Sequence, residues 1–148
     1  MFERDGRTLT VEVPRGLSHP DRALVWPLAV LVSLFLPWAT TATVTLPGAM
    51  FPTGWLMAVL AVALIVSWRR TTGQRRRRVW AGLGVALTVV VVYTAGTLTE
   101  VTRAHYRALT WSETATFIHP EPGSGCLLAF AASVAALVTA WYLDGGQP

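Results

Sequence analysis

The chain has no lysine, a single cysteine and little charge for its 148 residues. Charged residues make up only 14% of it, whereas soluble domains usually carry about 25%. The lone Cys126 excludes an intrachain disulfide and a cluster of thiolate metal ligands. In their place the chain has apolar residues, which are 53% of the total and are gathered into long blocks. These blocks, and not the net charge of +4, define the class of protein.

Four apolar blocks match membrane-spanning helices, which need about 20 residues to cross a hydrocarbon layer of about 30 Å. No ionisable residue lies within the core of any block. Because a backbone in lipid must satisfy its own hydrogen bonds, these blocks should be helices. The sequence therefore predicts an all-α membrane protein with four transmembrane helices in a domain of residues 23–143. The predicted spans are residues 23–38, 51–68, 79–98 and 125–143.

The positive charge is concentrated in one short segment, residues 69–78, and short arginine-rich loops stay in the cytoplasm. We therefore expect this inner loop and both tails, residues 1–22 and 144–148, to be cytoplasmic in a plasma-membrane protein. The outer loops would be residues 39–50 and 99–124. The same arginines are expected to hold anionic lipid headgroups rather than nucleic acid, because no aromatic side chain interleaves with them. They are Arg69, Arg70, Arg75, Arg76, Arg77 and Arg78.

One alternative is that the first span is a secretory signal peptide, since residues 40–42 form a tolerable cleavage site. The region before this span is long and charge-neutral instead of short and basic, which favours a retained helix. Tryptophans near the predicted span ends support the four-span reading, because indole rings favour the membrane interface. The expected interface anchors are Trp38, Trp68, Trp111 and Trp141.

An internal repeat relates the two halves of the chain. A shift of 73 residues places Trp38–Trp68 on Trp111–Trp141 without a gap, and both copies share the pattern W-x-x-T-A-T-x-x-x-P. Apolar composition explains this shared pattern poorly, because the pattern lies outside the apolar blocks. We therefore predict two tandem two-span repeats, related by an axis along the membrane normal.

The outer loops carry strand-like sequences. Residues 39–46 and 112–119 are rich in threonine and in β-branched or aromatic residues, and both end at a proline and a glycine-containing turn. This composition predicts a small β-strand-like extracytoplasmic cap in which the two loops pair antiparallel. The insertion at residues 98–109 is predicted to be helical. In the N-terminal tail, residues 8–13 alternate like a strand that lacks a partner.

Candidate chemistry is concentrated in the second outer loop. His105, His119 and Glu121 include enough ligand types for a metal, but their spacing matches no known metal motif. No serine or cysteine has the context of a catalytic nucleophile. We therefore predict no enzyme activity, no metal and no cofactor, and we keep Arg103, His105 and Arg107 as a possible outer binding face. In the fourth span, small residues at i, i+4 spacing predict a close helix contact, within the chain or between subunits. They are Ala132, Ala136 and Ala140.

The run L-P-W-A-T at Leu36–Thr40, the arginine-only inner loop and the tryptophan-ended spans resemble small uncharacterised four-span membrane proteins of high-GC Gram-positive bacteria. This resemblance concerns organisation and implies no activity. The expected function is that of a non-catalytic membrane subunit or assembly protein, acting through contacts with a membrane protein partner or with copies of itself. The alternatives are an extracytoplasmic binding or sensing module and a small oligomeric channel or transporter, which would need polar groups along its path.

Overall fold

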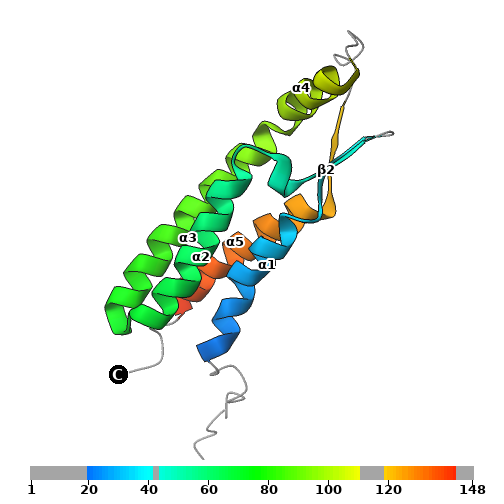
Figure 1. The fold of residues 1–148 in the computed structure, drawn as a ribbon. Helices are drawn as coiled ribbons and strands as arrows, with labels where there is room; N and C mark the ends of the chain where they lie inside the picture. The colour runs from blue at the N-terminus through cyan, green and yellow to red at the C-terminus, as the bar shows by residue number, and fades with distance from the viewer. Residues whose placement is uncertain (1–19, 42–43, 111–118, 143–148) are drawn as a thin grey trace, which may run out of the picture.

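The computed structural model describes residues 20–41, 44–110 and 119–142. This part of the chain is mostly helical, with a small three-stranded sheet at one end of the packed helices (Figure 1). The helical class and the small strand region are therefore confirmed. The elements are η2 Pro20–Leu24, α1 Val25–Ser33, β1 Pro37–Thr40, β2 Thr45–Pro47, η3 Gly48–Met50, α2 Gly54–Arg70, α3 Gly73–Gly96, α4 Leu98–Thr110, β3 Glu121–Pro122 and α5 Ser124–Tyr142.

Four helices form the core. Helix α1 packs against α2 and α5, and α3 packs against the same two helices. Helix α4 follows α3 beyond the end of this group and lies beside the strands (Figure 1). The buried positions of each packed helix recur at intervals of three or four residues, as one face of an α-helix does. In α3 these positions are Trp80, Gly84, Leu87, Val91 and Thr94.

Two of the described helices, α3 and α5, are long and apolar enough to cross a membrane. Residues Arg22–Ser33 form a shorter apolar helix. Helix α2 has 17 residues and so measures about 26 Å, slightly less than the hydrocarbon layer. The chain thus has two clear candidate spans and two shorter helices packed against them.

The first predicted span, residues 23–38, is too long. Helix α1 ends at Ser33, and the chain is already in strand β1 at Pro37. The proline explains the early end, because its ring disfavours a helical conformation at the preceding Leu36. Pro27 does not interrupt α1, because it lies in the first turn, where its missing N–H is not needed.

The third predicted span, residues 79–98, begins too late. Helix α3 starts at Gly73, so Arg75 and the three arginines after it lie in its first two turns and not in a loop. Only Thr71 and Thr72 connect α2 to α3, and Gly73 has a φ of 55°, which glycine adopts without steric cost. Arginine is a good helix former, so the change from apolar to basic does not end the helix. The predicted helix at residues 98–109 is confirmed as α4.

The cap is built differently from the prediction. Residues 39–46 were expected to form one strand, but the chain has two short strands here, and β1 pairs antiparallel with β2. The second outer loop contributes β3, which pairs antiparallel with the other edge of β1 and places Thr40 opposite Glu121. The two outer loops therefore do pair antiparallel, but through residues 121–122 and not through the predicted strand-like segment of the second loop. The predicted strand at residues 112–119 lies almost entirely outside the described residues. The strand-like segment at residues 8–13 also lies outside them.

The burial pattern of the helices does not follow the register of the predicted gapless repeat. A shift of 73 residues places the buried Met57 and Trp68 on Phe130 and Trp141, which are 48% and 71% exposed. A shift of 72 residues instead matches every buried position of α2 with a buried position of α5 and places Trp68 on Ala140. One residue of slip rotates a helix face by about 100°, so the matched tryptophans point in different directions.

The alanine stripe of the fourth span serves packing within the chain. Ala132, Ala136 and Ala140 are all buried in the face of α5 that the other helices cover. The close approach is visible at Gly84 of α3, where an added Cβ would lie 3.3 Å from the Cα of Leu137. Small side chains on both helices therefore let α3 and α5 approach closely.

Candidate functional site

The arginines gather at the tight connection between α2 and α3, which we call the arginine turn: Arg69, Arg70 and Arg75–Arg78 around Thr71 and Thr72. The turn is well ordered by hydrogen bonds. The backbone N–H and the hydroxyl of Thr71 both donate to the carbonyl of Ser67, at 2.9 and 2.6 Å. Arg76 then donates its Nε–H to the carbonyl of Thr71 at 2.6 Å. These bonds fix where α3 begins relative to the end of α2.

Aromatic rings contact two of the guanidinium groups of the arginine turn. The rings of Trp68 and Trp80 lie 4.8 Å apart, and the indole N–H of Trp80 donates to the carbonyl of Leu64 at 3.1 Å. The guanidinium of Arg76 lies 4.5 Å above the Trp68 ring, and that of Arg77 lies 5.4 Å from the Trp141 ring. Both distances are within the range of a cation–π contact. Two of the six arginines therefore hold helix ends together.

The other four arginines are exposed. Within the described part of the chain, none of them forms an ion pair or a contact with a ring. No acidic residue occurs anywhere between Asp21 and Glu100, so the stretch of sequence that contains these arginines offers no counter-charge. They are Arg69, Arg70, Arg75 and Arg78.

The tryptophans expected at the interface have three different outcomes. Trp38 is fully buried in the protein, and its indole N–H donates to the carbonyl of Ser33 at 2.8 Å, so it is a core residue and not a lipid-facing anchor. Trp38 is buried because it lies on strand β1, which packs against α5, and its ring contacts Gly48 of η3 and Gly125 of α5. Trp68 is also buried, whereas Trp141 is exposed near the end of α5. Trp111 lies outside the described residues.

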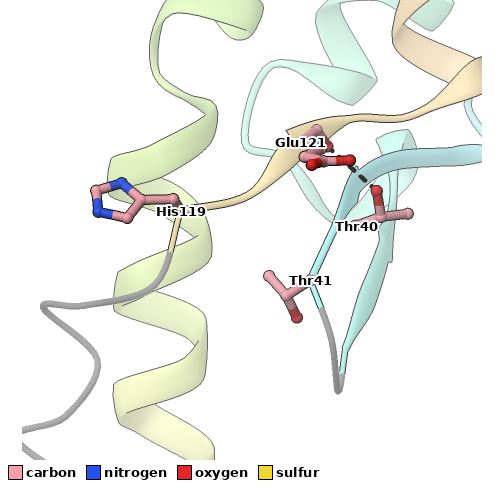
Figure 2. Close-up of a pocket in the computed structure, with 4 residues that line it drawn as sticks. All are labelled: Thr40, Thr41, His119 and Glu121. Carbon is pink, nitrogen blue, oxygen red and sulfur yellow. Dashed lines mark hydrogen bonds between the residues drawn. The ribbon is translucent and has the colours of Figure 1, made fainter.

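A second candidate site is an open pocket of about 350 Å³ in the cap, lined by Thr40, Thr41, His119 and Glu121 (Figure 2). Pairing between β1 and β3 brings these positions together, and the hydroxyl of Thr40 donates to the carbonyl of Glu121 at 3.4 Å. In Figure 2 the His119 ring is directed away from the other three side chains. The acid and the imidazole therefore do not face a common point. Sequence reasoning missed Thr40 and Thr41, whose role depends on which strand pairs with β1.

The possible outer binding face does not form a single face. On helix α4, Arg103 and Arg107 are one turn apart, whereas His105 lies about 200° around the helix from Arg103. His105 is half-buried on the side that also carries Thr102, whose hydroxyl is buried and has no hydrogen-bond partner among the described residues. Across the described ranges, no three His, Cys, Asp or Glu side chains are grouped closely enough to hold a metal ion.

Hydroxyl side chains within the packed helices are mostly satisfied by their own helix. Ser33, Ser133 and Thr139 each donate to a carbonyl three or four residues earlier. One pair joins two segments: the hydroxyls of Thr53 and Thr94 lie 2.5 Å apart, where α2 begins and α3 approaches its end. The helices are thus tied at this point by a polar contact next to the cap.

Comparison with known proteins adds no relative to this description. No family model matches the chain, and searches of curated proteins and of solved structures also find no match.

Proposed function

We propose that this chain is a non-catalytic membrane subunit that crosses the bilayer four times and acts through contacts with other proteins. The observation that carries this proposal is the apolar outer surface of all four packed helices. Large apolar side chains on these outer faces are between 36% and 78% exposed, and so much exposed apolar surface is rare on a monomer in water. Lipid would cover it at no cost. Examples are Leu28 on α1, Trp55 and Val59 on α2, Val89 on α3, and Leu127 on α5.

The two shorter helices are compatible with crossing a bilayer. Helix α2 ends in Arg69 and Arg70, whose long side chains can extend to the headgroups. The helix Arg22–Ser33 is about 18 Å long, but the chain stays apolar through Ala39. Trp38 and Ala39 are covered by protein, which supports non-helical backbone at membrane depth. Local thinning of the bilayer would accommodate the remaining mismatch.

The proposed orientation places the arginine turn in the cytoplasm and the cap outside. Short, arginine-rich connections remain on the cytoplasmic side during insertion. With four crossings, both termini are then also cytoplasmic. The cap, at the opposite end of the packed helices, faces the exterior (Figure 1).

The non-catalytic part of the proposal is supported by the polar groups. A channel or an ion-coupled transporter needs polar or ionisable groups that face a path through the membrane. The four packed helices instead direct their buried hydroxyls to their own backbones, and in the cap pocket the His119 ring is directed away from the other side chains. An outer sensing module is less well supported, because Arg103 and His105 lie on different sides of α4.

Accessibility labelling tests the topology. In a background carrying Cys126→Ala, Thr45→Cys and Glu121→Cys are expected to react with a membrane-impermeant maleimide applied to intact cells. Gln74→Cys is expected to react only after the cells are opened. All three positions are exposed, and Gln74 avoids the positive φ at Gly73. Labelling of Gln74→Cys in intact cells would contradict the proposed orientation.

Co-purification tests the function. Extracted in a mild detergent from its own membrane, the tagged chain is expected to elute with a second membrane protein at fixed stoichiometry. His119→Ala and Glu121→Gln should retain this partner, because the proposal gives these side chains no chemical role. A chain that elutes only with copies of itself and conducts ions in vesicles would favour the channel alternative. Loss of function with the His119 or Glu121 variant, at normal protein abundance, would make the cap pocket a chemical site.

A further inference from the structure

The six arginines of the arginine turn divide into two groups by their contacts. Arg76 and Arg77 lie against Trp68 and Trp141, and both are half-buried. The other group is fully on the surface and makes no ion pair with any described residue. It consists of Arg69, Arg70, Arg75 and Arg78. The first group has a structural role, while the second is available to a ligand from outside the chain.

Among the described residues, no acidic side chain is paired with this second group. Arg75 and Arg78 lie in the first two turns of α3, where the helix dipole is positive and disfavours further positive charge. Like charges within one turn of a helix also repel one another. Because no acidic residue occurs between Asp21 and Glu100, α2 and α3 themselves cannot offset this repulsion, which an anion bound from outside these helices would do.

The nearby aromatic residues indicate where that anion lies. Trp141 and Tyr142, at the end of α5, are 71% and 77% exposed. Exposed tryptophan and tyrosine at a span end mark the level of the lipid headgroups. The Arg77 guanidinium lies against the Trp141 ring, so the arginine turn is at the same level. Planar guanidinium groups bind phosphate oxygens through two parallel hydrogen bonds, which suits a phospholipid headgroup.

We infer that Arg69, Arg70, Arg75 and Arg78 bind the headgroups of anionic phospholipids, while Arg76 and Arg77 hold the helix ends that present them. This inference rests on the membrane placement proposed above. It adds that four of the six arginines bind lipid while two stabilise the fold, and that anionic lipid is preferred over zwitterionic lipid. A basic side chain near an anionic surface gains about 1 kcal/mol, so each arginine is expected to contribute about fivefold in affinity.

The test measures thermal unfolding of the full chain in neutral detergent micelles, with added short-chain phosphatidylglycerol or phosphatidylcholine. A ligand that binds the folded state raises the melting temperature, and at a fixed concentration the rise increases with the logarithm of its affinity. We expect phosphatidylglycerol to raise it more than phosphatidylcholine, and high salt to reduce the difference. Inorganic phosphate at the same concentration controls for an effect of free anions and should have little effect.

The variants assign the effect to residues. Replacing all four exposed arginines with glutamine should reduce the response to phosphatidylglycerol to that of phosphatidylcholine. Arg103→Gln with Arg107→Gln is the matched control for charge removed elsewhere and should keep the full response. Arg76→Gln should lower the melting temperature without lipid but preserve the response. If the fourfold variant does not fold, the pairs R69Q/R70Q and R75Q/R78Q should each weaken binding about 25-fold.

Three results would overturn the inference: equal responses to the two lipids, an undiminished response in the fourfold variant, or the same loss in the Arg103/Arg107 control. An equal response to an RNA oligonucleotide at matched phosphate concentration would assign the arginines to nucleic acid instead. Failure here is distinct from failure of the proposed function. A chain that passes the labelling test but shows no lipid preference loses only this inference, whereas one that fails the labelling test loses its membrane placement.

Discussion

Replacing Trp38 with alanine is expected to lower the free energy of unfolding by about 3–5 kcal/mol, the usual cost of truncating a fully buried aromatic side chain. The indole fills the junction of α1, β1 and α5, and its ring centre lies 6.0 Å from that of Phe51. Its N–H donates to the carbonyl of Ser33, which would lose this buried hydrogen bond in the variant and keep only the one from the backbone N–H of Leu36. Both effects act at the point that connects the cap to the helices.

The matched control for this prediction is Trp55→Ala. Trp55 is 78% exposed on the outer face of α2, so its removal creates no internal cavity. Melting temperatures in one detergent, together with protein abundance in the membrane, measure both variants. We expect a large fall for Trp38→Ala and a change within about 0.5 kcal/mol for Trp55→Ala. Equal losses from the two variants would mean that Trp38 faces lipid, contrary to its burial.

Replacing Gly84 with leucine is expected to separate α3 from α5 and to destabilise the fold by about 3 kcal/mol or more. At this position an added Cβ would lie 3.3 Å from the Cα of Leu137 and 3.5 Å from its backbone nitrogen. Backbone atoms cannot move aside as a flexible side chain can. The helices must therefore shift apart, and the contacts of the α5 alanines with their neighbours would be lost with them.

Gly82→Leu is the control for Gly84→Leu, on the same helix and two residues away. A Cβ at Gly82 would meet nothing within 4 Å, and the residue is exposed. The substitution changes hydrophobicity and helix propensity by the same amount but adds its volume on the outer face. We expect Gly82→Leu to retain the melting temperature. If the two variants behaved alike, the close approach of α3 and α5 would not be a determinant of stability.

The sequence predicted the helices better than their ends. Apolar composition locates α5 within one residue at each end, because apolar composition and helicity coincide there. The two properties separate at Gly73, where α3 begins before the apolar residues do, since arginines are good helix formers. They separate again at Pro37, where the chain stays apolar but turns into a strand. Hydropathy reports the surroundings of a residue and does not report its backbone conformation.

The functional residues were harder to predict for a related reason. A tryptophan at the end of an apolar block can be exposed on the outer surface, as Trp141 is, or fill the protein core, as Trp38 does, and both satisfy the same sequence pattern. The arginine turn was found from its charge alone. The division between Arg76, which lies against Trp68, and the exposed Arg75 depends on the two-residue connection and on the rotation of α3. Neither feature can be read from composition.

The buried face of α5 has a consequence for how the chain tolerates mutation. This face consists of glycine, alanine, serine and cysteine, whereas the faces of α2 and α3 also carry leucine, methionine and tryptophan. Almost any substitution at a buried alanine of α5 adds side-chain volume, which forces the neighbouring helices apart. Changes at Leu87 or Trp80 mostly remove volume and leave cavities. A substitution that enlarges a residue of α5, paired with one that shrinks its neighbour on another helix, would keep the total volume of the core. Such pairs let the sequence of the core change while its shape is retained.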